Sequence, residues 1–232
     1  MRVIMSLAIP AQAFDLDGYA IVDDILSAEA CTWLSGQVDA LPVSSAGSRE
    51  ILEHEWAQRL AIGIRANHAF AQLVAPNLVA VQCTLFNKSD TRNWGVPYHQ
   101  DLSVPVAEQV IDPRLTAWSQ KEGRWFVQPP AALLDLLVAV RVHLDPCPLD
   151  AGALRVIPGT HRRGRLSEVD VRNARDNEEE VACVTTGGGA LVLRPLLLHA
   201  SSKLKPGYRR RVLHFVFGPR ELPFGLRWAV CA

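Results

Sequence analysis

The sequence predicts a mainly β protein, a β-sandwich or jelly roll with flanking helices packed on its outside. The first 80 residues read as helices with connectors, whereas the rest divides into short apolar or alternating runs. Pro, Gly, Asp and Asn, which favour turns, separate these runs, and many short strands after a helical start are typical of this architecture. We expect a single domain over residues 1–232, with a helical flank at 1–80 and a β core at 81–220.

The helical flank contains three segments that we expect to be helices. Ser27 is the N-cap of the first, AEACTWLSGQVDAL, and Pro42 ends it. HEWAQRLAI and the segment near NHAFAQLV are further candidates. Residues 1–13, MRVIMSLAIPAQA, have a basic residue, a short apolar run and a small-x-small ending, as a signal peptide does. Because the run is short and contains Ser6 and Pro10, an N-terminal strand or arm is favoured.

The β core is predicted from runs rich in β-branched and apolar residues. They are NLVAVQCTLFNK, VPYHQDLSVPV, LLVAVRVHLD, GALRVIPG, EEVACVTT, GALVLRPLLLHA and RRVLHFVFG. RNARDNEEE, residues 172–180, is expected to be a solvated loop or a helix end. The stretch from Thr116 to Pro130 looks like a long loop over one face of the sheet, where substrate contacts are common.

Composition excludes several classes of partner. Lys plus Arg and Asp plus Glu both number 24, so no net charge attracts nucleic acid or an acidic membrane. The apolar runs are much shorter than a membrane span. The five cysteines are scattered and form no CxxC pair, which favours reduced thiols over a disulfide framework or a four-cysteine zinc site. We expect a cytoplasmic monomer or homodimer that acts on a small molecule and binds neither nucleic acid nor membrane.

Three residues form a candidate metal site. In VPYHQDLSVPV, His99 and Asp101 are two residues apart, so in a strand both would project from the same face. His199 closes the apolar run LVLRPLLLHA and precedes a turn of small residues, where it could point into a barrel mouth. Two histidines and one carboxylate hold Fe(II) and leave three coordination positions open. The other histidines are expected to be surface, loop or packed residues: His54, His68, His143, His161 and His214.

A cluster of arginines follows the second histidine. Arg210 lies eleven residues after His199, between Arg209 and Arg211, and leads into the apolar run VLHFVFG. A buried guanidinium needs a partner, and a dicarboxylate cosubstrate would supply one through a two-pronged contact. In strand geometry Arg210 and His214 share one face, while Arg209 and Arg211 face the other way. A surface salt-bridge cluster is the alternative interpretation.

Three motifs together resemble one enzyme family. HQD with its apolar flanks, GALRVIPGTHRRG, and HASS followed by RRVLHF resemble the phytanoyl-CoA dioxygenase family, from about Asp15 to the C-terminus. These are Fe(II)- and 2-oxoglutarate-dependent oxygenases with a double-stranded β-helix, a cupin-like jelly roll. The resemblance implies that His99, Asp101 and His199 are the iron ligands. It also implies that Arg210 pairs with the far carboxylate of 2-oxoglutarate, although the arginines on either side remain alternatives because the preceding loop varies in length.

The resemblance assigns further positions around the cosubstrate. Thr84 and Ser201 match positions that line it in the family. Arg141 falls where an aromatic lining residue can occur, so it is expected to contact either the cosubstrate or an acid group of the substrate. Relatives that halogenate replace the carboxylate ligand by a small residue. Because Asp101 is present, hydroxylation or another oxidation without halide is the expected chemistry.

The expected activity is therefore that of a dioxygenase. It would use Fe(II), 2-oxoglutarate and O2 to oxidise a C–H bond of a small organic molecule, with release of succinate and CO2. Four aromatic residues in predicted loops could wall the pocket or simply pack: Trp94, Trp118, Trp125 and Phe126. Two alternatives stay open, a catalytically silent cupin-like binding protein and a zinc-dependent hydrolase that uses the same three ligands.

Overall fold

The structure is a computed structural model, and it describes residues 2–4, 11–42, 47–71, 73 and 75–232. The strands are β1 (Arg2–Ile4), β2 (Tyr19–Val22), β3 (Gly47–Ser48), β4 (Leu78–Lys88), β5 (Val96–His99), β6 (Val104–Val106), β7 (Thr116–Lys121), β8 (Arg124–Gln128), β9 (Val138–His143), β10 (Leu154–Val156), β11 (Val181–Cys183), β12 (Ala190–Leu193), β13 (His199–Ser201) and β14 (Arg210–Pro219). The helices are α1 (Ala11–Asp17), α2 (Ala28–Asp39), α3 (Glu55–Ala66), α4 (Ala131–Leu134) and α5 (Glu168–Asn177), with 3-10 turns η1 (Ile51–Glu53), η2 (Leu149–Ala151) and η3 (Thr160–Arg163).

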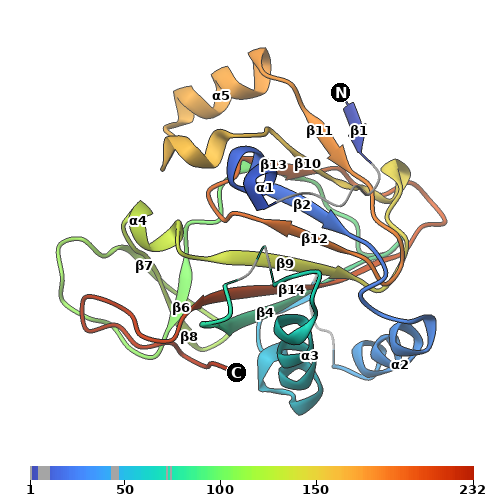
Figure 1. Cartoon of the computed structure of the whole chain (residues 1–232), viewed down its shortest axis with the longest axis horizontal. Coiled ribbons are helices and arrows are strands. Elements are labelled where there is room, and N and C mark those ends of the chain that lie inside the picture. The colour runs from blue at the N-terminus through green and yellow to red at the C-terminus, as the bar shows by residue number, and fades with distance from the viewer. Residues whose placement is uncertain (1, 5–10, 43–46, 72, 74) are drawn as a thin grey trace.

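Two sheets form the body of the fold (Figure 1). The larger has the strand order β2-β12-β9-β14-β4-β3, and the smaller has the order β1-β11-β10-β13-β5. A separate three-stranded sheet, β6-β8-β7, stands at the side of the body near β4 and β14. The mainly β class with flanking helices that the sequence predicts is thus confirmed.

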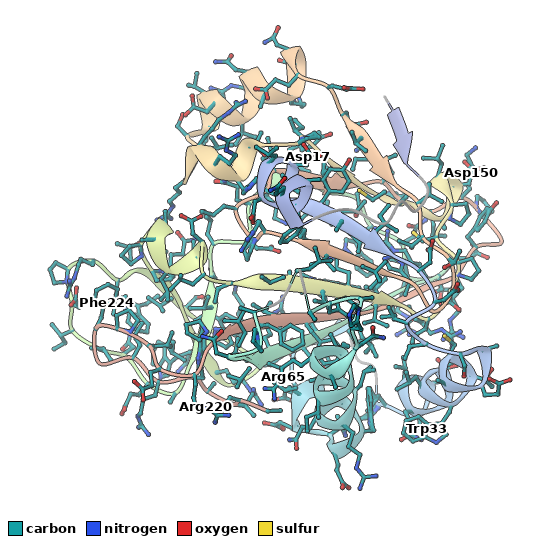
Figure 2. The ribbon with its side chains drawn as sticks, in the orientation of Figure 1. Asp17, Trp33, Arg65, Asp150, Arg220 and Phe224 are labelled. Atoms are coloured by element: carbon teal, nitrogen blue, oxygen red, sulfur yellow. The ribbon has the colours of Figure 1, made fainter. Side chains whose placement is uncertain are left out.

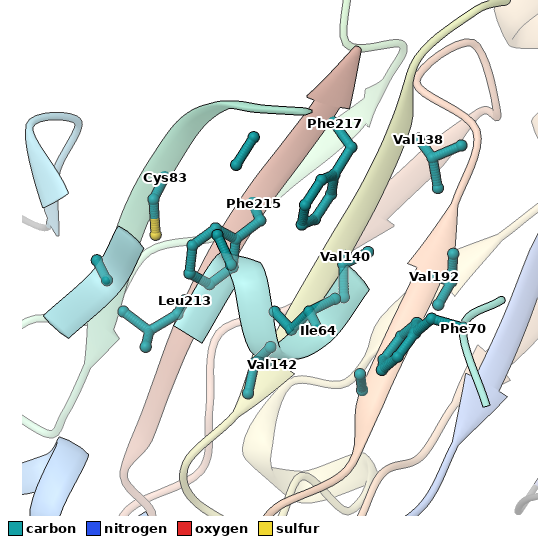
Figure 3. Packing of buried hydrophobic residues seen from close by; sticks show 14 of the residues in the cluster. Ile64, Phe70, Cys83, Val138, Val140, Val142, Val192, Leu213, Phe215 and Phe217 are labelled. Atoms are coloured by element: carbon teal, nitrogen blue, oxygen red, sulfur yellow. The ribbon is translucent and has the colours of Figure 1, made fainter. Parts of the chain in front are cut away.

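The central strands of the larger sheet are buried on both faces. On β14, Leu213, Phe215 and Phe217 point outward into the apolar cluster under the helices (Figure 3). Residues of the other parity on the same strand, Arg210 and His214, line a cavity on the inner side. Strands with two buried faces read as continuous apolar runs, because burial on both sides removes the alternation that marks a half-exposed strand.

Helices α2 and α3 cover the outer face of the larger sheet, and α5 lies at the opposite side of the molecule, beside β11 (Figure 1). The Ser27 hydroxyl accepts from the Ala30 N–H at 3.2 Å, so the predicted N-cap of α2 is confirmed. α2 buries Leu34 and Val38 in the cluster under the helices. Trp33, on the far side of the helix, is 55% exposed (Figure 2).

The space between the sheets holds an apolar cluster and a cavity. The cluster includes Ile21, Leu154, Val156 and Leu191. The cavity has a volume of about 360 Å³ and is lined by polar as well as apolar side chains from strands of both sheets.

Several local predictions are corrected by the structure. The expected loop from Thr116 to Pro130 is mostly the hairpin β7–β8, whose Glu122-Gly123 turn has positive φ at both residues (50° and 76°). Such turns match the twist of the flanking strands. The expected helix near NHAFAQLV is a series of turns over residues 68–71, and residues 72 and 74 lie outside the described ranges. By contrast, the predicted helix end within residues 172–180 is confirmed, because α5 ends there at Asn177; this helix begins with a capping box at Ser167.

The N-terminal prediction is tested in part. A strand covers Arg2–Ile4 and a short helix begins at Ala11, whereas residues 1 and 5–10 lie outside the described residues. Within the described ranges, no helix has both the length and the apolar character needed to cross a membrane.

Candidate metal and cosubstrate site

The smaller sheet brings the three predicted ligands together. His99 ends β5 and His199 begins β13, and the two are direct cross-strand partners in the antiparallel register. Asp101 follows two residues after β5 ends. Its carboxylate oxygens lie 3.6 Å from His99 Nε2 and 3.8 Å from His199 Nε2. One ligand atom from each of the three residues lies within 4.8 Å of the others, as a metal site requires.

Backbone carbonyls fix the orientation of both imidazole rings. His99 Nδ1 lies 2.9 Å from the Pro97 carbonyl oxygen, and His199 Nδ1 lies 2.8 Å from that of Leu197. Because a carbonyl oxygen can only accept, both Nδ1 atoms carry the hydrogen. The lone pair of each neutral ring is therefore on Nε2, which faces the carboxylate. This is the outer hydrogen bond that metal-binding histidines commonly make.

The residue between His99 and Asp101 anchors the segment that carries them. The Gln100 side chain points away from the ligands, donates to the Gly164 carbonyl at 2.8 Å and the Leu196 carbonyl at 2.6 Å, and accepts from the Leu166 N–H at 2.8 Å. The expected alternation of side chains is thus observed, although β5 ends at His99 and Asp101 is outside regular strand. The anchored amide holds the two ligands in place.

Protonation in this site suits metal binding. Burial raises the pKa of Asp101, but the nearby histidines outweigh it and hold that pKa far below its ordinary range. Burial lowers the pKa of His199 to about 4. For His99 burial lowers the pKa, and the neighbouring Asp101 carboxylate outweighs burial, so the pKa lies above its ordinary value. At neutral pH Asp101 is ionised and His199 is neutral, which are the forms that coordinate metals.

The larger sheet presents three buried cations to the same cavity. Lys88 on β4, Arg141 on β9 and Arg210 on β14 are 1%, 7% and 2% exposed. Arg210 donates to the Gly152 carbonyl. Among the described residues, the buried Nε atoms of Arg141 and Arg210 have no hydrogen-bond partner. No carboxylate in the described part of the chain lies within ion-pair distance of these three groups, so the cavity offers unmet hydrogen-bond donors to an anion.

Lys88 and Arg210 face each other across neighbouring strands as register partners. The Lys88 ammonium donates to Ser201 Oγ at 3.2 Å and to the Ser202 carbonyl at 3.0 Å, and lies 4.9 Å from the centre of the Trp94 ring. Burial, and then the charge of Arg210, lower the pKa of Lys88 to about 7. A dianion bound here would compensate for the burial of the ammonium and for its repulsion by Arg210.

The structure separates the three consecutive arginines. Arg209 pairs with Asp39 on the surface, and Arg211 pairs with Asp145 at 2.6 Å and Asp39 at 3.1 Å. Arg210 alone of the three lines the cavity. The salt-bridge interpretation therefore applies to two of them, as strand parity suggested. Thr84 and Ser201, the other predicted positions around the cosubstrate, also line the cavity.

Two cavity residues were missed as site residues from the sequence. His214 was expected to be a packed or hydrogen-bonded side chain. Its Nδ1 lies 3.1 Å from Arg141 Nη1, and its Nε2 lies 3.9 Å from Asp101 Oδ2. Lys88 has the same strand parity as Thr84 on β4, so the alternation of side chains along the strand could have placed Lys88 in the site. Burial, followed by the charge of Arg141, lowers the pKa of His214 to about 3.

The four aromatic residues divide into two pairs. Trp94 and Phe126 line the cavity. Trp118 and Trp125 contact each other edge to face, with ring centres 6.3 Å apart, and pack on a second apolar cluster. The wall interpretation therefore holds for the first pair and the packing interpretation for the second.

A comparison with known protein families identifies the family of this chain. The model of the phytanoyl-CoA dioxygenase family matches residues 14–212. The chain belongs to this family. Iron and 2-oxoglutarate, with O2, are the cofactors that family membership implies, as expected from the motifs. A comparison with curated proteins finds no match.

Solved structures share the fold at low identity. The epimerase SnoN in complex with Fe3+, alpha ketoglutarate and nogalamycin RO is 15% identical, with a TM-score of 0.70, covering 93% of this chain and 85% of that one. EctD from S. alaskensis, in its apoform, is 19% identical, with a TM-score of 0.69 and coverage of 100% and 88%. EvdO2 from Micromonospora carbonacea var. aurantiaca, complexed with 2-oxoglutarate, is 19% identical, with a TM-score of 0.62 and coverage of 94% and 93%. The jelly roll of 2-oxoglutarate oxygenases is thus the fold of this family member.

Proposed function

We propose that this single-domain protein hydroxylates, or otherwise oxidises, a C–H bond of a small organic molecule, and that it does so with Fe(II), 2-oxoglutarate and O2. The proposal rests on one observation: two sets of charged or metal-binding residues face each other across one cavity. His99, Asp101 and His199 converge from the smaller sheet, and buried cations without carboxylate partners face them from the larger one. A metal fits the first set and a dicarboxylate fits the second.

Each residue has a role in this proposal. The two Nε2 lone pairs and the Asp101 carboxylate would hold the metal. Arg210 and Lys88 bind the far carboxylate of 2-oxoglutarate, with Ser201 beside them, and Thr84 lines its path. When bound, iron and 2-oxoglutarate supply the oxidising chemistry, in which 2-oxoglutarate is converted to succinate and CO2.

The remaining side chains orient and shield the reacting groups. Arg141 donates to His214 Nδ1 through Nη1, so the His214 hydrogen is on Nε2, 3.9 Å from Asp101 Oδ2. At that distance the Nε2–H makes no hydrogen bond, but its dipole favours the ionised Asp101 carboxylate. Phe126 and Trp94 cover the cavity walls and exclude water from it. Because Asp101 occupies the carboxylate position, oxidation without halide is the proposed outcome.

The test is the visible absorption of the protein under argon, first with Fe(II) and then with 2-oxoglutarate. We expect a new charge-transfer band, its loss in His199→Ala, and a requirement for more 2-oxoglutarate in Arg210→Ala. Arg209→Ala is the matched control, because the neighbouring arginine is paired on the surface and should leave the titration unchanged. Absence of the band in a folded, metal-binding wild type would refute the proposal.

The same protein samples also distinguish the oxygenase from the two alternative functions. A binding protein without turnover would show the band but release no succinate with any substrate tried. A zinc hydrolase would be active with Zn(II) and inactive with Fe(II), and would be indifferent to Arg210→Ala, since it needs no dicarboxylate site. Succinate release with a screened substrate would support the oxygenase.

A further inference from the structure

The charges around the cavity do not balance once the metal and the cosubstrate are counted. Five fixed cations line it, and Asp101 is the one carboxylate among the lining residues described: the cations are Arg49, Lys88, Lys121, Arg141 and Arg210. Arg49 is neutralised by Glu122, at 2.7 Å, which leaves four. Fe(II), the Asp101 carboxylate and the 2-oxoglutarate dianion together contribute one negative charge. A surplus of positive charge therefore remains, even if Lys88 is counted as neutral.

Two of these cations, Arg141 and Lys121, are not used by the cosubstrate, and Arg141 is already engaged with His214. Lys88 and Arg210 are register partners on β4 and β14 of the larger sheet. Lys121 comes instead from the hairpin β7–β8, and its ammonium lies 4.8 Å from the centre of the Phe126 ring. No carboxylate in the described part of the chain lies within ion-pair distance of it. Burial, and then the charge of Arg49, lower the pKa of Lys121.

The hairpin that carries Lys121 is fixed at its tip. Glu122 accepts from the Arg49 backbone N–H at 2.7 Å and pairs with its guanidinium, and Arg124 pairs with Glu53. The lysine is thus held between two anchored residues rather than on a free loop. A cation positioned in this way loses less conformational entropy when it binds an anion.

Apolar side chains also line the cavity, and Phe126 lies beside Lys121. Leu102, Phe126, Leu137 and Val216 line it together with Lys121. A volume of about 360 Å³ is at the small end of the range for ligand pockets, and 2-oxoglutarate must occupy part of it. The space that remains therefore suits a small molecule with an acid group and an apolar body.

We propose that the substrate is a small organic acid whose carboxylate is bound by Lys121, with its apolar part packed against Phe126 and Leu102. The inference rests on the proposed function and names the substrate class of that same site. It assigns Lys121 as a residue that determines specificity.

The test uses matched pairs of probes on protein loaded with Fe(II) and 2-oxoglutarate under argon. Benzoate, 3-phenylpropanoate and octanoate are each compared with their primary amides by isothermal titration calorimetry. We expect at least one acid to bind about tenfold more tightly than its amide, the usual effect of one charge-assisted hydrogen bond. Lys121→Gln should remove this preference and Lys121→Arg should keep it. Lys203→Gln, an exposed lysine outside the cavity lining, is the control.

Three results would overturn the inference: equal binding of acids and amides, an acid preference that survives Lys121→Gln, or no binding by either series. The charge-transfer band is recorded on every sample. Its absence would count against the proposed function itself. A normal band without an acid preference would leave the oxygenase in place and overturn only the substrate class.

Discussion

The affinity for 2-oxoglutarate should depend on pH through Lys88. This side chain is 1% exposed, has Arg210 opposite it in the register, and contacts only neutral acceptors in Ser201 and Ser202. Burial and the charge of Arg210 lower its pKa to about 7, so the ammonium is about half ionised at pH 7. A bound carboxylate favours the charged form and raises that pKa. Binding therefore takes up a proton, and affinity falls as pH rises above 7.

The size of the effect follows from the charged fraction. With a pKa of about 7, the protonated fraction of Lys88 is close to one at pH 5, about one half at pH 7 and about one hundredth at pH 9. If the uncharged form binds about tenfold more weakly, as Lys88→Met should, the apparent dissociation constant rises by about fivefold between pH 7 and pH 9. Below pH 6 this contribution is constant. Lys88→Met should bind about tenfold more weakly at pH 6 and show no such dependence.

The assay is an anaerobic titration of 2-oxoglutarate, followed by the charge-transfer band, at pH 6, 7, 8 and 9. Fe(II) is kept saturating, because protonation of His99, whose pKa is raised, would otherwise affect metal binding at the acidic end. Arg209→Ala serves as the control for a neighbouring charge change. Either a flat profile in the wild type or the same slope in Lys88→Met would refute the reasoning.

Three further substitutions test other contacts. His214→Leu should weaken Fe(II) binding by less than about tenfold, measured against a competing chelator, because Nε2 lies 3.9 Å from Asp101 Oδ2, beyond hydrogen-bond distance; a larger loss would contradict this. Gly152→Ala should lower the free energy of unfolding by about 1–3 kcal/mol in urea, because φ is +68° and the new Cβ would lie 2.5 Å from the Ser202 carbonyl oxygen. His143→Leu should leave stability unchanged or raise it by about 1 kcal/mol, since burial holds the pKa of His143 well below its ordinary value and neither ring nitrogen has a partner among the described residues; a clear loss would mean that a nitrogen is bonded.

Much of the site could be predicted because strand parity and local motifs determine which of its side chains lie on the same face. The HxD spacing placed His99 and Asp101 together, and parity separated Arg210 from Arg209 and Arg211 before any ion pair was known. The cross-strand pairing of His99 with His199 could not be read locally. That register is set by packing of the smaller sheet, over a separation of a hundred residues.

The features that were not predicted depend on tertiary contacts, which a short stretch of sequence does not reveal. Lys88 ends an apolar strand and looks like a solvated terminus, yet the Ser201–Ser202 turn buries it. The hairpin β7–β8 was predicted to be a loop, although it contains the Glu122-Gly123 turn signal. The contact that fixes its tip, between Glu122 and Arg49, joins residues far apart in the sequence.

The two sheets supply different parts of the site. All three predicted metal ligands belong to the smaller sheet or follow directly from it, so a metal alone would join only neighbouring segments of that sheet. The cation at Arg210 belongs to the larger sheet, across the cavity. A dicarboxylate held by the metal at one end and by Arg210 at the other would span both sheets. The cosubstrate, more than the metal, would therefore tie the two halves of the sandwich together.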